Sequence, residues 1–280
     1  MQTLIRHPAR LPVILLLALH AVIVIYPLFW MITNSFKPTE EIYAASWSLP
    51  TVWMVENYAK AWRGGISAYF LNSVIVTGGT ILLTLAISVL AAFGMVRAET
   101  AGAGRAAGLV LMACIGGMLV APQVALVPLY KMMQVLRLQD THWALILTYT
   151  AYRVPITILL VRAVFLAVPR DLDDCAHIDG CSSLQTLWHV YLPMSRSILL
   201  TASVLTAYHA WNEFLFAIIF IDSDRLKTIP SGLMNFRDAL MTDWGVLVAG
   251  LVISAAPIIV LFIVAQRYFL SGFAAGAVKG

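Results

Sequence analysis

The chain has 280 residues, of which 61% are hydrophobic and only 11% are charged. Soluble domains carry about 25% charged residues, so this chain has too little polar surface for an exterior in water, and we expect it to face lipid. The net charge of +4 is modest and spread along the chain, unlike the concentrated basic stripe of a nucleic-acid-binding protein.

The first long apolar run covers residues 11–32 and follows two basic residues, Arg6 and Arg10. It exceeds the apolar core of a secretory signal peptide, which is about 7–15 residues long. At about 1.5 Å per residue, a helix of this length can cross a hydrocarbon core of about 30 Å. We therefore predict an uncleaved membrane anchor.

Five further apolar runs of helical length follow along the chain. A single segment in lipid has to satisfy its backbone hydrogen bonds internally, which favours helices. The sequence therefore predicts an all-α membrane protein, with one transmembrane domain over residues 1–280 and six spans. The expected spans are residues 11–32, 73–96, 106–121, 143–168, 198–221 and 244–265.

Between the third and fourth spans, residues 124–138 are apolar but interrupted by Pro128 and two basic residues. We expect this segment to lie at the membrane interface or to cap the bundle. Asp140 and Thr141 offer an N-cap for the fourth span.

The sequence predicts neither a metal site nor a catalytic centre. The three cysteines, Cys114, Cys175 and Cys181, form no C-x-x-C pair and no even-numbered framework. The six histidines form no H-x-x-x-H arrangement. The chain also lacks the G-x-x-x-x-G-K-[ST] loop that holds nucleotide phosphates. We therefore expect a non-catalytic subunit that cannot hydrolyse ATP.

The loop at residues 169–197 is the most informative segment. Asp171 is a suitable N-cap for a short helix, and Asp173 and Asp174 lie in the first turn, where the helix dipole favours acids. Gly180 tolerates a left-handed backbone, so we expect the helix to end there.

A second short helix is predicted over residues 184–191. Ser182 or Ser183 can cap its start, and we expect it to end before Pro193. Two structured helices in water indicate that a partner protein covers this loop.

The loop contains the run Asp174-Cys175-Ala176-His177-Ile178-Asp179-Gly180, followed by Leu192-Pro193-Met194. These residues resemble the EAA loop of permease subunits in ATP-binding-cassette (ABC) importers. Asp174 stands where Glu is usual, Cys175 and Cys181 stand where Ala is usual, and Ser197 falls where a second Pro is common. In that family the loop forms coupling helices that sit in a groove of the cytoplasmic ATPase. The coupling residues that the resemblance implies are Asp171, Asp174, Ala176, Asp179, Gly180, Leu184, Trp188 and Pro193.

Other segments resemble the maltose-permease G-type branch of this family, which is found in carbohydrate importers. These segments are Asn-Ser-Phe-Lys-Pro at 34–38, Glu-Asn-Tyr at 56–58, Asn-Ser at 72–73, Trp-Asn-Glu-Phe at 211–214, Gln-Arg-Tyr-Phe at 266–269 and Gly-Ala-Val-Lys-Gly at 276–280. The resemblance covers nearly the whole chain in order. It implies the type I ABC importer permease fold, and ATPase contacts at Gly276, Ala277 and Lys279.

The resemblance also implies an orientation. Counting Lys and Arg gives nine on one side of the membrane and eight on the other, which leaves the orientation open. In the resembling family, both termini and the coupling loop are cytoplasmic. We therefore expect a multi-pass protein of the bacterial inner membrane with both termini inside.

The partners that the resemblance implies are a second permease subunit in a heterodimer, two cytoplasmic ATP-binding subunits and an extracytoplasmic solute-binding protein. This chain itself would bind no cofactor, because the ATPase subunits would hold ATP and Mg²⁺. The expected substrate is a sugar or polyol derivative, moved by alternating access. The loop at residues 222–243 is expected to reach toward the binding protein, the alternative being an ordinary solvated connector.

Polar residues inside the spans are candidates for function, because burying them in lipid is costly. One interpretation is that they line the translocation path, where aromatic and hydrogen-bonding groups suit a sugar. The other is that Arg153 and Glu213 satisfy one another or backbone groups between packed helices. In the maltose-type family the partner permease supplies most sugar contacts. The candidates are Tyr149, Arg153, Tyr208, Trp211, Asn212 and Glu213.

Two functions of other classes stay open at this point. A stand-alone secondary transporter usually carries a pseudo-symmetric repeat or paired broken helices, and the sequence shows neither. A scaffold subunit would have no transport path. Uptake that survives ablation of the loop at 169–197 would favour the secondary transporter.

Overall fold

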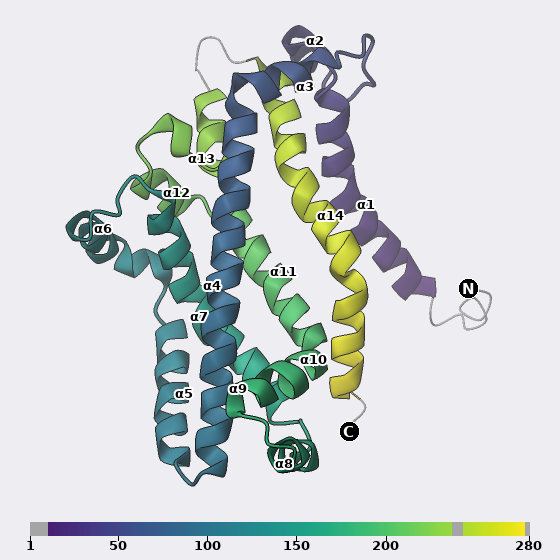
Figure 1. Cartoon of the computed structure of the whole chain (residues 1–280). Coiled ribbons are helices and arrows are strands. Elements are labelled where there is room, and N and C mark those ends of the chain that lie inside the picture. The colour runs from purple at the N-terminus through teal and green to yellow at the C-terminus, as the bar shows by residue number, and fades with distance from the viewer. Residues whose placement is uncertain (1–10, 237–242, 278–280) are drawn as a thin grey trace. The chain divides into compact units, whose positions relative to one another are not determined.

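Residues 11–236 and 243–277 are described here in a computed structural model (Figure 1). Within these ranges every regular element is helical and none is a strand, which confirms the predicted all-α class. The chain divides into two compact units, Met1–Ser67 with Leu233–Ala255 and Ala68–Gly232 with Ala256–Gly280.

The first unit contains a long apolar helix and several short ones. Its elements are α1 (Leu11–Asn34), α2 (Thr39–Ala45), α3 (Glu56–Ala61), the π-helical η2 (Trp62–Ile66), the 3-10 turn η6 (Leu233–Phe236) and the first part of α14 (Trp244–Ala277). α1 contains no Asp, Glu, Lys or Arg, and almost all of its side chains are exposed. A helix that is apolar all round needs lipid or another protein on every side.

Buried polar side chains hold the chain that follows α1. Asn57 of α3 donates from Nδ2 to the carbonyl oxygens of Ser35 and Lys37, each at 3.0 Å. The fully buried Lys37 donates from Nζ to the carbonyl of Ala45 at 2.8 Å, at the C-terminus of α2, where the helix dipole favours a cation. Asn57, Ser35 and Lys37 come from two of the segments on which the family resemblance rests, so those segments hold this turn together.

The second unit contains the other long helices. Its elements are α4 (Ser67–Thr100), α5 (Gly104–Met118), η3 (Pro122–Ala125), α6 (Leu126–Val135), α7 (His142–Phe165), α8 (Arg170–Ile178), α9 (Ser183–Thr186), η4 (Leu187–Tyr191), α10 (Leu192–Met194), α11 (Arg196–Asn212), α12 (Leu215–Phe220), η5 (Asp224–Leu226), α13 (Ile229–Gly232) and the rest of α14. α4 has 34 residues and is therefore about 51 Å long, enough to cross a hydrocarbon core of about 30 Å and to extend beyond it.

Three apolar clusters of described residues hold the second unit together, one of them joining α4, α5 and α7 around Met95, Ala107 and Ile158. Another joins α4, α7 and α12 around the buried side chains of Tyr149 and Phe220. The third joins the last turns of α4 and α7 to η4, where the ring of Tyr191 lies 5.1 Å from the rings of both Phe93 and Phe165. Because η4 belongs to the third cluster, the loop after α7 is packed against the helices that it connects.

Helices occupy all six ranges that were predicted to span the membrane. Among the described residues, four helices are long and apolar enough by themselves, namely Pro12–Asn34, Glu56–Thr100, His142–Phe165 and Trp244–Gln266. The third and fifth ranges hold α5 and α11, with 15 and 17 residues. Each lies at a sharp bend, of 90° between Gly104–Met118 and Pro122–Val135 and of 80° between Ser183–Met194 and Arg196–Asn212. The number of spans is six if each bent pair counts as one.

The structure corrects three of the predicted spans. The fourth was expected to reach residue 168, but α7 ends at Phe165. The third span was expected to reach residue 121, but α5 ends at Met118. Ala121 is extended, with ψ 132°, as expected for a residue that precedes a proline. The fifth span was expected to be continuous, but the extended backbone of Glu213, with ψ 126°, separates α11 from α12.

Gly245, near the start of α14, has no room for a side chain. A Cβ there would lie 2.3 Å from the carbonyl oxygen of Lys37 and 2.6 Å from Nδ2 of Asn57. Overpacking of this kind costs about 1–3 kcal/mol, so we expect Gly245→Ala to lower the Tm of the purified protein in detergent. Gly94→Ala is the control, because a Cβ at that position on α4 would meet nothing within 4 Å. Equal Tm values for the two variants would contradict the close packing.

Candidate functional site

A defined hydrogen-bond motif terminates α8, the first helix of the loop that follows α7. Gly180 follows α8 with φ +77°, a left-handed conformation that favours glycine. The backbone N–H of Cys181 donates to the carbonyl of Ala176 at 2.9 Å, and that of Gly180 donates to His177 at 3.1 Å. These paired bonds form a Schellman motif. The helix therefore ends at the glycine where the sequence predicts it to end.

Ser182 caps the second helix of the loop. Its Oγ accepts from the backbone N–H of Gln185 at 3.4 Å, while the side-chain oxygen of Gln185 accepts from the N–H of Ser182 at 2.8 Å. Together these bonds form a capping box. Ser182 is one of the two serines that were predicted for this role.

Two other local predictions were wrong. α8 begins at Arg170, directly after Pro169, so Asp171 lies inside the first turn and does not cap the helix. The second helix does not end before Pro193 but continues through α10 to Met194. Pro193 lies in the first turn of α10, after the π-helical η4, a position where the missing N–H of proline is tolerated.

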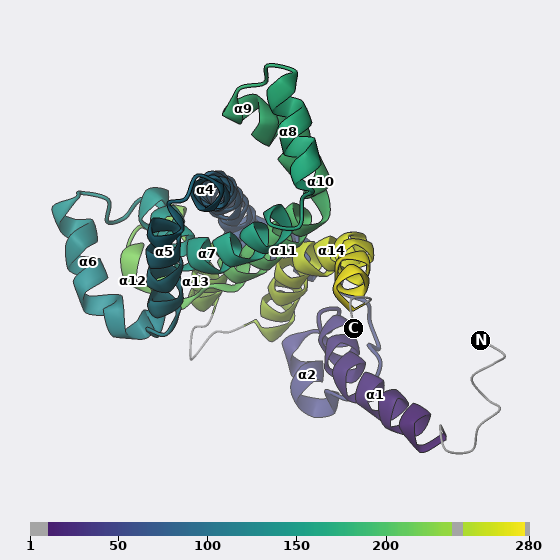
Figure 2. The same ribbon diagram turned by 90° about the horizontal axis from the view of Figure 1, so that it is seen from below.

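We call residues 170–194 the hook. The hook lies beside the last turns of α4, and Figure 2 shows α8 and α9 next to each other. Three large apolar side chains of the hook are 66–84% exposed, namely Ile178, Leu184 and Trp188. Large apolar side chains exposed on a structured polar loop indicate a surface that another protein covers.

The predicted coupling residues divide between the two sides of the hook. Ala176 is buried within the chain, so its small side chain lets α8 pack on its own chain. The others are exposed, namely Asp171, Asp174, Asp179, Gly180, Leu184, Trp188 and Pro193.

An ion pair joins the hook to the end of α4. Nη1 of Arg97 lies 2.9 Å from a carboxylate oxygen of Asp173 in the first turn of α8. The guanidinium of Arg97 also lies over the ring of Phe93, 5.2 Å from its centre, which adds a cation–π attraction. From the sequence, Asp173 was expected only as an acid near a helix N-terminus, because its partner lies 76 residues away.

A second ion pair, also near the end of α4, joins α4 to α7. Arg162, in the last turn of α7, pairs with Glu99 of α4. The sequence offered one signal for both pairs, which is that Arg97 and Glu99 lie close together at the end of a predicted span.

Glu213 fills the break between α11 and α12. Its carboxylate accepts hydrogen bonds from the hydroxyl of Tyr149 at 2.7 Å, from the N–H of Phe216 at 3.1 Å and from the N–H of Ala217 at 3.3 Å. It therefore satisfies backbone donors that the first turn of α12 leaves open. The proposed partnership of Arg153 with Glu213 does not occur, and the carboxylate is satisfied by Tyr149 and backbone groups instead.

The other predicted path residues do not gather into one site. Trp211 is buried, with its ring 5.5 Å from that of Phe70. Asn212 donates from Nδ2 to the carbonyl of Tyr208 at 2.8 Å, and the side chain of Tyr208 is exposed.

A cavity of about 450 Å³ lies among α5, η3, α7 and α11. Its wall is mainly apolar, and its polar side chains include Thr148, Tyr152, Arg153 and His209. Of the predicted path residues, Arg153 alone lines this cavity. In the part of the chain that the structure describes, no group of three or more His, Cys, Asp or Glu side chains is arranged to hold a metal ion.

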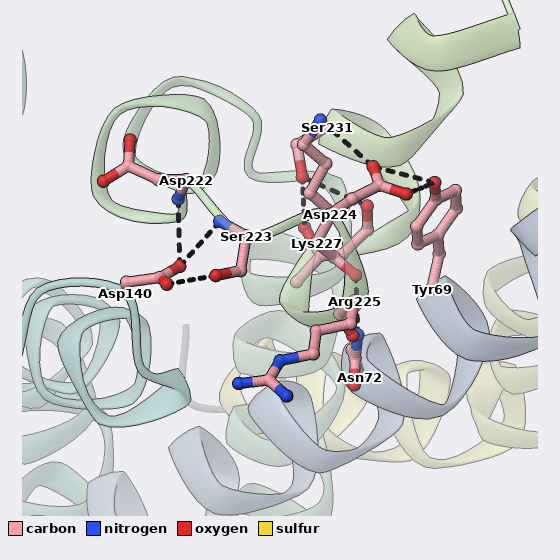
Figure 3. Close-up of polar contacts among 10 residues, drawn as sticks. Tyr69, Asn72, Asp140, Asp222, Ser223, Asp224, Arg225, Lys227 and Ser231 are labelled. Atoms are coloured by element: carbon pink, nitrogen blue, oxygen red, sulfur yellow. Dashed lines mark hydrogen bonds and ion pairs between the residues drawn. The ribbon is translucent and has the colours of Figure 1, made fainter.

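A polar network holds the segment Asp222–Gly232 against the start of α4 and the chain before α7 (Figure 3). Asn72 donates from Nδ2 to the carbonyls of Arg225 and Lys227 at 2.8 and 2.9 Å. Ser73 accepts from the N–H of Ile229 at 2.9 Å. Asn72 and Ser73 form another of the segments on which the resemblance rests, and their role here is to hold this loop.

Asp140 is the second centre of the network (Figure 3). Its carboxylate accepts from the backbone N–H groups of Asp222 at 3.0 Å and Ser223 at 2.8 Å, and from the Ser223 hydroxyl. Asp140 does not cap α7, where Thr141 occupies the N-cap position without a side-chain cap. The hydrogen bond from the Ser223 hydroxyl lowers the pKa of Asp140 below its ordinary value, and the two backbone N–H groups act in the same direction.

The three residues predicted to contact an ATPase at the C-terminus are only partly described. Gly276 and Ala277 form the last turn of α14. Lys279 lies outside the described residues.

Comparison with known sequences decides the family. Residues 92–273 match the family described as binding-protein-dependent transport system inner membrane component. The chain is also 54% identical over 264 residues to the probable ABC transporter permease protein YurM of Bacillus subtilis, covering 94% of this chain and 87% of that protein. The chain belongs to this family of transport permeases. It is 33% identical to the trehalose/maltose transport system permease protein MalG of Thermococcus litoralis, with 94% of each chain covered.

The fold of the permease agrees with that of a solved importer. It superposes with a TM-score of 0.78, at 20% identity, on a chain of a bacterial ABC transporter involved in the import of the acidic polysaccharide alginate, covering 91% of this chain and 94% of that one. The prediction of an ABC importer permease of the maltose-permease type is thus confirmed. Membership of a binding-protein-dependent family also removes the stand-alone secondary transporter from consideration.

We expect Asp173→Asn to loosen the hook. A hydrogen bond to a charged group contributes about 1.5–3 kcal/mol, so amide hydrogen exchange in residues 170–194 should become about 10-fold faster or more. Mass spectrometry of exchange in the purified permease measures this. Asp174→Asn, at the exposed neighbouring position, should leave the exchange unchanged. Equal exchange in both variants would show that the ion pair does not hold α8.

We expect Asp140→Asn to lower the Tm most at neutral pH. Because the pKa of Asp140 is lowered in the folded protein, its contribution is complete above the ordinary carboxylate pKa and is lost as the pH falls through the lowered pKa. The Tm difference between wild type and variant should therefore be constant above about pH 5 and should shrink between about pH 5 and about pH 3. A difference that stays constant over this range would contradict the role of the carboxylate charge.

Proposed function

We propose that this permease is one of two membrane subunits of an ATP-driven importer for a sugar or polyol derivative. The hook binds the ATPase, and closure of the ATPase drives the helices between inward-facing and outward-facing states. The observation that supports this most directly is the exposed apolar surface of Ile178, Leu184 and Trp188 on a hook with fixed helix ends. A transporter subunit needs such a surface if its energy comes from another protein.

The polar contacts near the two ends of α4 support an orientation of the permease in the membrane. Asn72 and Arg97 lie 25 residues apart on α4, which corresponds to about 37 Å along the helix. This separation exceeds the hydrocarbon core of about 30 Å, so the hook and the segment Asp222–Gly232 belong on opposite sides of the membrane. We place the hook and both termini in the cytoplasm, and the segment Asp222–Gly232 outside, facing the solute-binding protein.

The partners follow from the same proposal. The chain has no phosphate-binding loop, so ATP and Mg²⁺ belong to two ATPase subunits, and this permease is a non-catalytic subunit without a cofactor of its own. A second permease completes the path in a heterodimer, and the exposed circumference of α1 leaves surface for it. The C-terminal residues Gly276, Ala277 and Lys279 add contacts to the ATPase pair.

The substrate class rests on the relatives. The Thermococcus litoralis relative is named for trehalose and maltose transport, and the importer with the same fold is named for a polysaccharide. A cavity with the aromatic side chain of Tyr152 in its wall suits the apolar face of a sugar ring.

The test is ATP-driven uptake into liposomes by the complete importer with Gly180→Pro in this subunit. Proline fixes φ near −65°, whereas Gly180 has φ +77°, so the substitution breaks the turn between α8 and α9. We expect uptake to fall at least 10-fold, with loss of the ATPase on purification or with ATP hydrolysis that no longer drives uptake. Gly102→Pro is the matched control, because Gly102 has φ +82° in the turn after α4, outside the hook.

The outcomes separate the proposal from its rivals. If the Gly102 variant transports and the Gly180 variant does not, the hook couples ATP hydrolysis to uptake. If both variants transport as the wild type does, the hook has no part in coupling. A complex that assembles but shows no ATP-driven uptake of any sugar would leave a scaffold role.

A further inference from the structure

The cavity among α5, η3, α7 and α11 contains a positive charge without a counter-charge from its own chain. Arg153 lines the cavity, and no Asp or Glu is among the lining residues that the structure describes. Its buried Nε has no hydrogen-bond acceptor within the described part of the chain, as is also true of Arg97 and Arg162, but unlike those two it forms no ion pair there. A guanidinium in a mainly apolar wall is costly unless something pairs with it.

Two arginines at helix ends of the same unit show how the chain pairs such a group. Arg97 and Arg162 each place a terminal nitrogen on a carboxylate, that of Asp173 or Glu99. The acid at the break between α11 and α12 is Glu213. Its carboxylate does not pair with Arg153 but accepts from the hydroxyl of Tyr149 and from two backbone N–H groups. The chain thus provides a carboxylate for each of two arginines. The carboxylate of Glu213 is engaged by other groups, and Arg153 faces the cavity without one.

The lipid headgroups do not supply the missing charge. Arg153 is the twelfth of the 24 residues of α7, so it lies about 17 Å from either end of the helix. An arginine near a helix end can extend its head group to the interface, but one at the middle of a span of this length cannot reach it. The counter-charge therefore comes from outside this chain, and a solute that enters the cavity can supply it.

The cavity has the size and composition of a ligand site. Its volume of about 450 Å³ falls within the range of about 300–1,000 Å³ for small-molecule sites, which combine apolar walls with a few polar groups. Tyr152, whose ring stacks on Phe216, lines the same cavity as Arg153, and Thr148 and His209 add further polar groups. A cavity lined by an aromatic side chain and a guanidinium matches a sugar ring that carries an acidic group, since arginine binds carboxylates through two parallel hydrogen bonds.

We propose that Arg153 binds an anionic group of the transported solute, so that the importer takes a sugar derivative that bears a carboxylate. This inference rests on the proposed function and specifies its substrate class. It assigns to Arg153 a role in specificity on the translocation path, separate from the packing role of Glu213.

The experiment compares two solutes that differ only in charge. The probes are a radiolabelled disaccharide with one uronic acid residue and the same disaccharide with that carboxyl reduced to the alcohol. The complete importer, with its ATPase and binding protein, is reconstituted in liposomes, and the ratio of acidic to neutral uptake is measured. We expect the wild type to favour the acidic probe and Arg153→Gln to lower the ratio at least 10-fold, as expected for loss of a charge-assisted hydrogen bond.

Two variants serve as controls. Arg153→Lys keeps the positive charge but lacks the planar guanidinium that donates two parallel hydrogen bonds, so it should restore part of the ratio. Arg137→Gln makes the same charge change at an exposed position outside the cavity and should leave the ratio unchanged.

Several outcomes would overturn the proposal. One is a wild type that takes up the neutral probe and not the acidic one, a result that leaves the sugar-importer proposal intact. Another is that Arg153→Gln lowers the uptake of both probes equally and that the two permeases separate during size-exclusion chromatography. This result would assign the counter-charge to the second permease. Absence of ATP-driven uptake of either probe would count against the importer proposal and this one together.

Discussion

The length of α4 is the constraint on which the second unit depends. A polar network is stable only where water or complete internal pairing satisfies its groups. α4 is about 51 Å long and therefore has two ends that lie clear of the hydrocarbon core. At its start Asn72 and Ser73 hold the segment Asp222–Gly232, and at its end Arg97 holds the hook. The two loops that we propose as partner surfaces are thus attached to one continuous helix.

Between these ends the chain has to satisfy its polar groups without water. The break after α11 exposes the first N–H groups of α12, and Glu213 accepts from two of them and from the hydroxyl of Tyr149. A helix broken inside a membrane protein is tolerated only where such partners exist. Glu213 therefore explains why the fifth span can bend, and it also explains why its charge is not available to Arg153.

The sequence predicted those features that depend on neighbouring residues. The six apolar ranges, the left-handed Gly180 and the cap at Ser182 each follow from a local pattern, and the structure shows them where they were expected. Features that depend on a distant partner were not predicted. Asp140 bonds to residues about 80 positions away instead of capping the next helix. Asp173 lies in the first turn of α8 as predicted, but its partner Arg97 lies 76 positions away.

The family resemblance identified segments without explaining them. Asn57 and Asn72 stood out as matching residues, but only the structure shows that each donates two hydrogen bonds to backbone carbonyls of another segment. The prediction that the second helix of the hook ends before Pro193 failed for a different reason. The π-helical η4 shifts the hydrogen-bond register, so the proline falls in a first turn, and a rule that counts only α-helical positions places the helix end too early.

The internal structure of the hook suits the transmission of force. Its two helix ends are fixed by the Schellman motif and the capping box, and its inner side packs on α4 and α7 through Tyr191 and the pair of Arg97 with Asp173. In the coupling that we propose, a displacement applied at the exposed Trp188 therefore passes to both helices. On α7 it meets Pro155, a residue inside the helix that removes one backbone hydrogen bond and allows a bend. Arg153 lies two residues beyond, so the place where α7 can bend adjoins the cavity that the solute would enter.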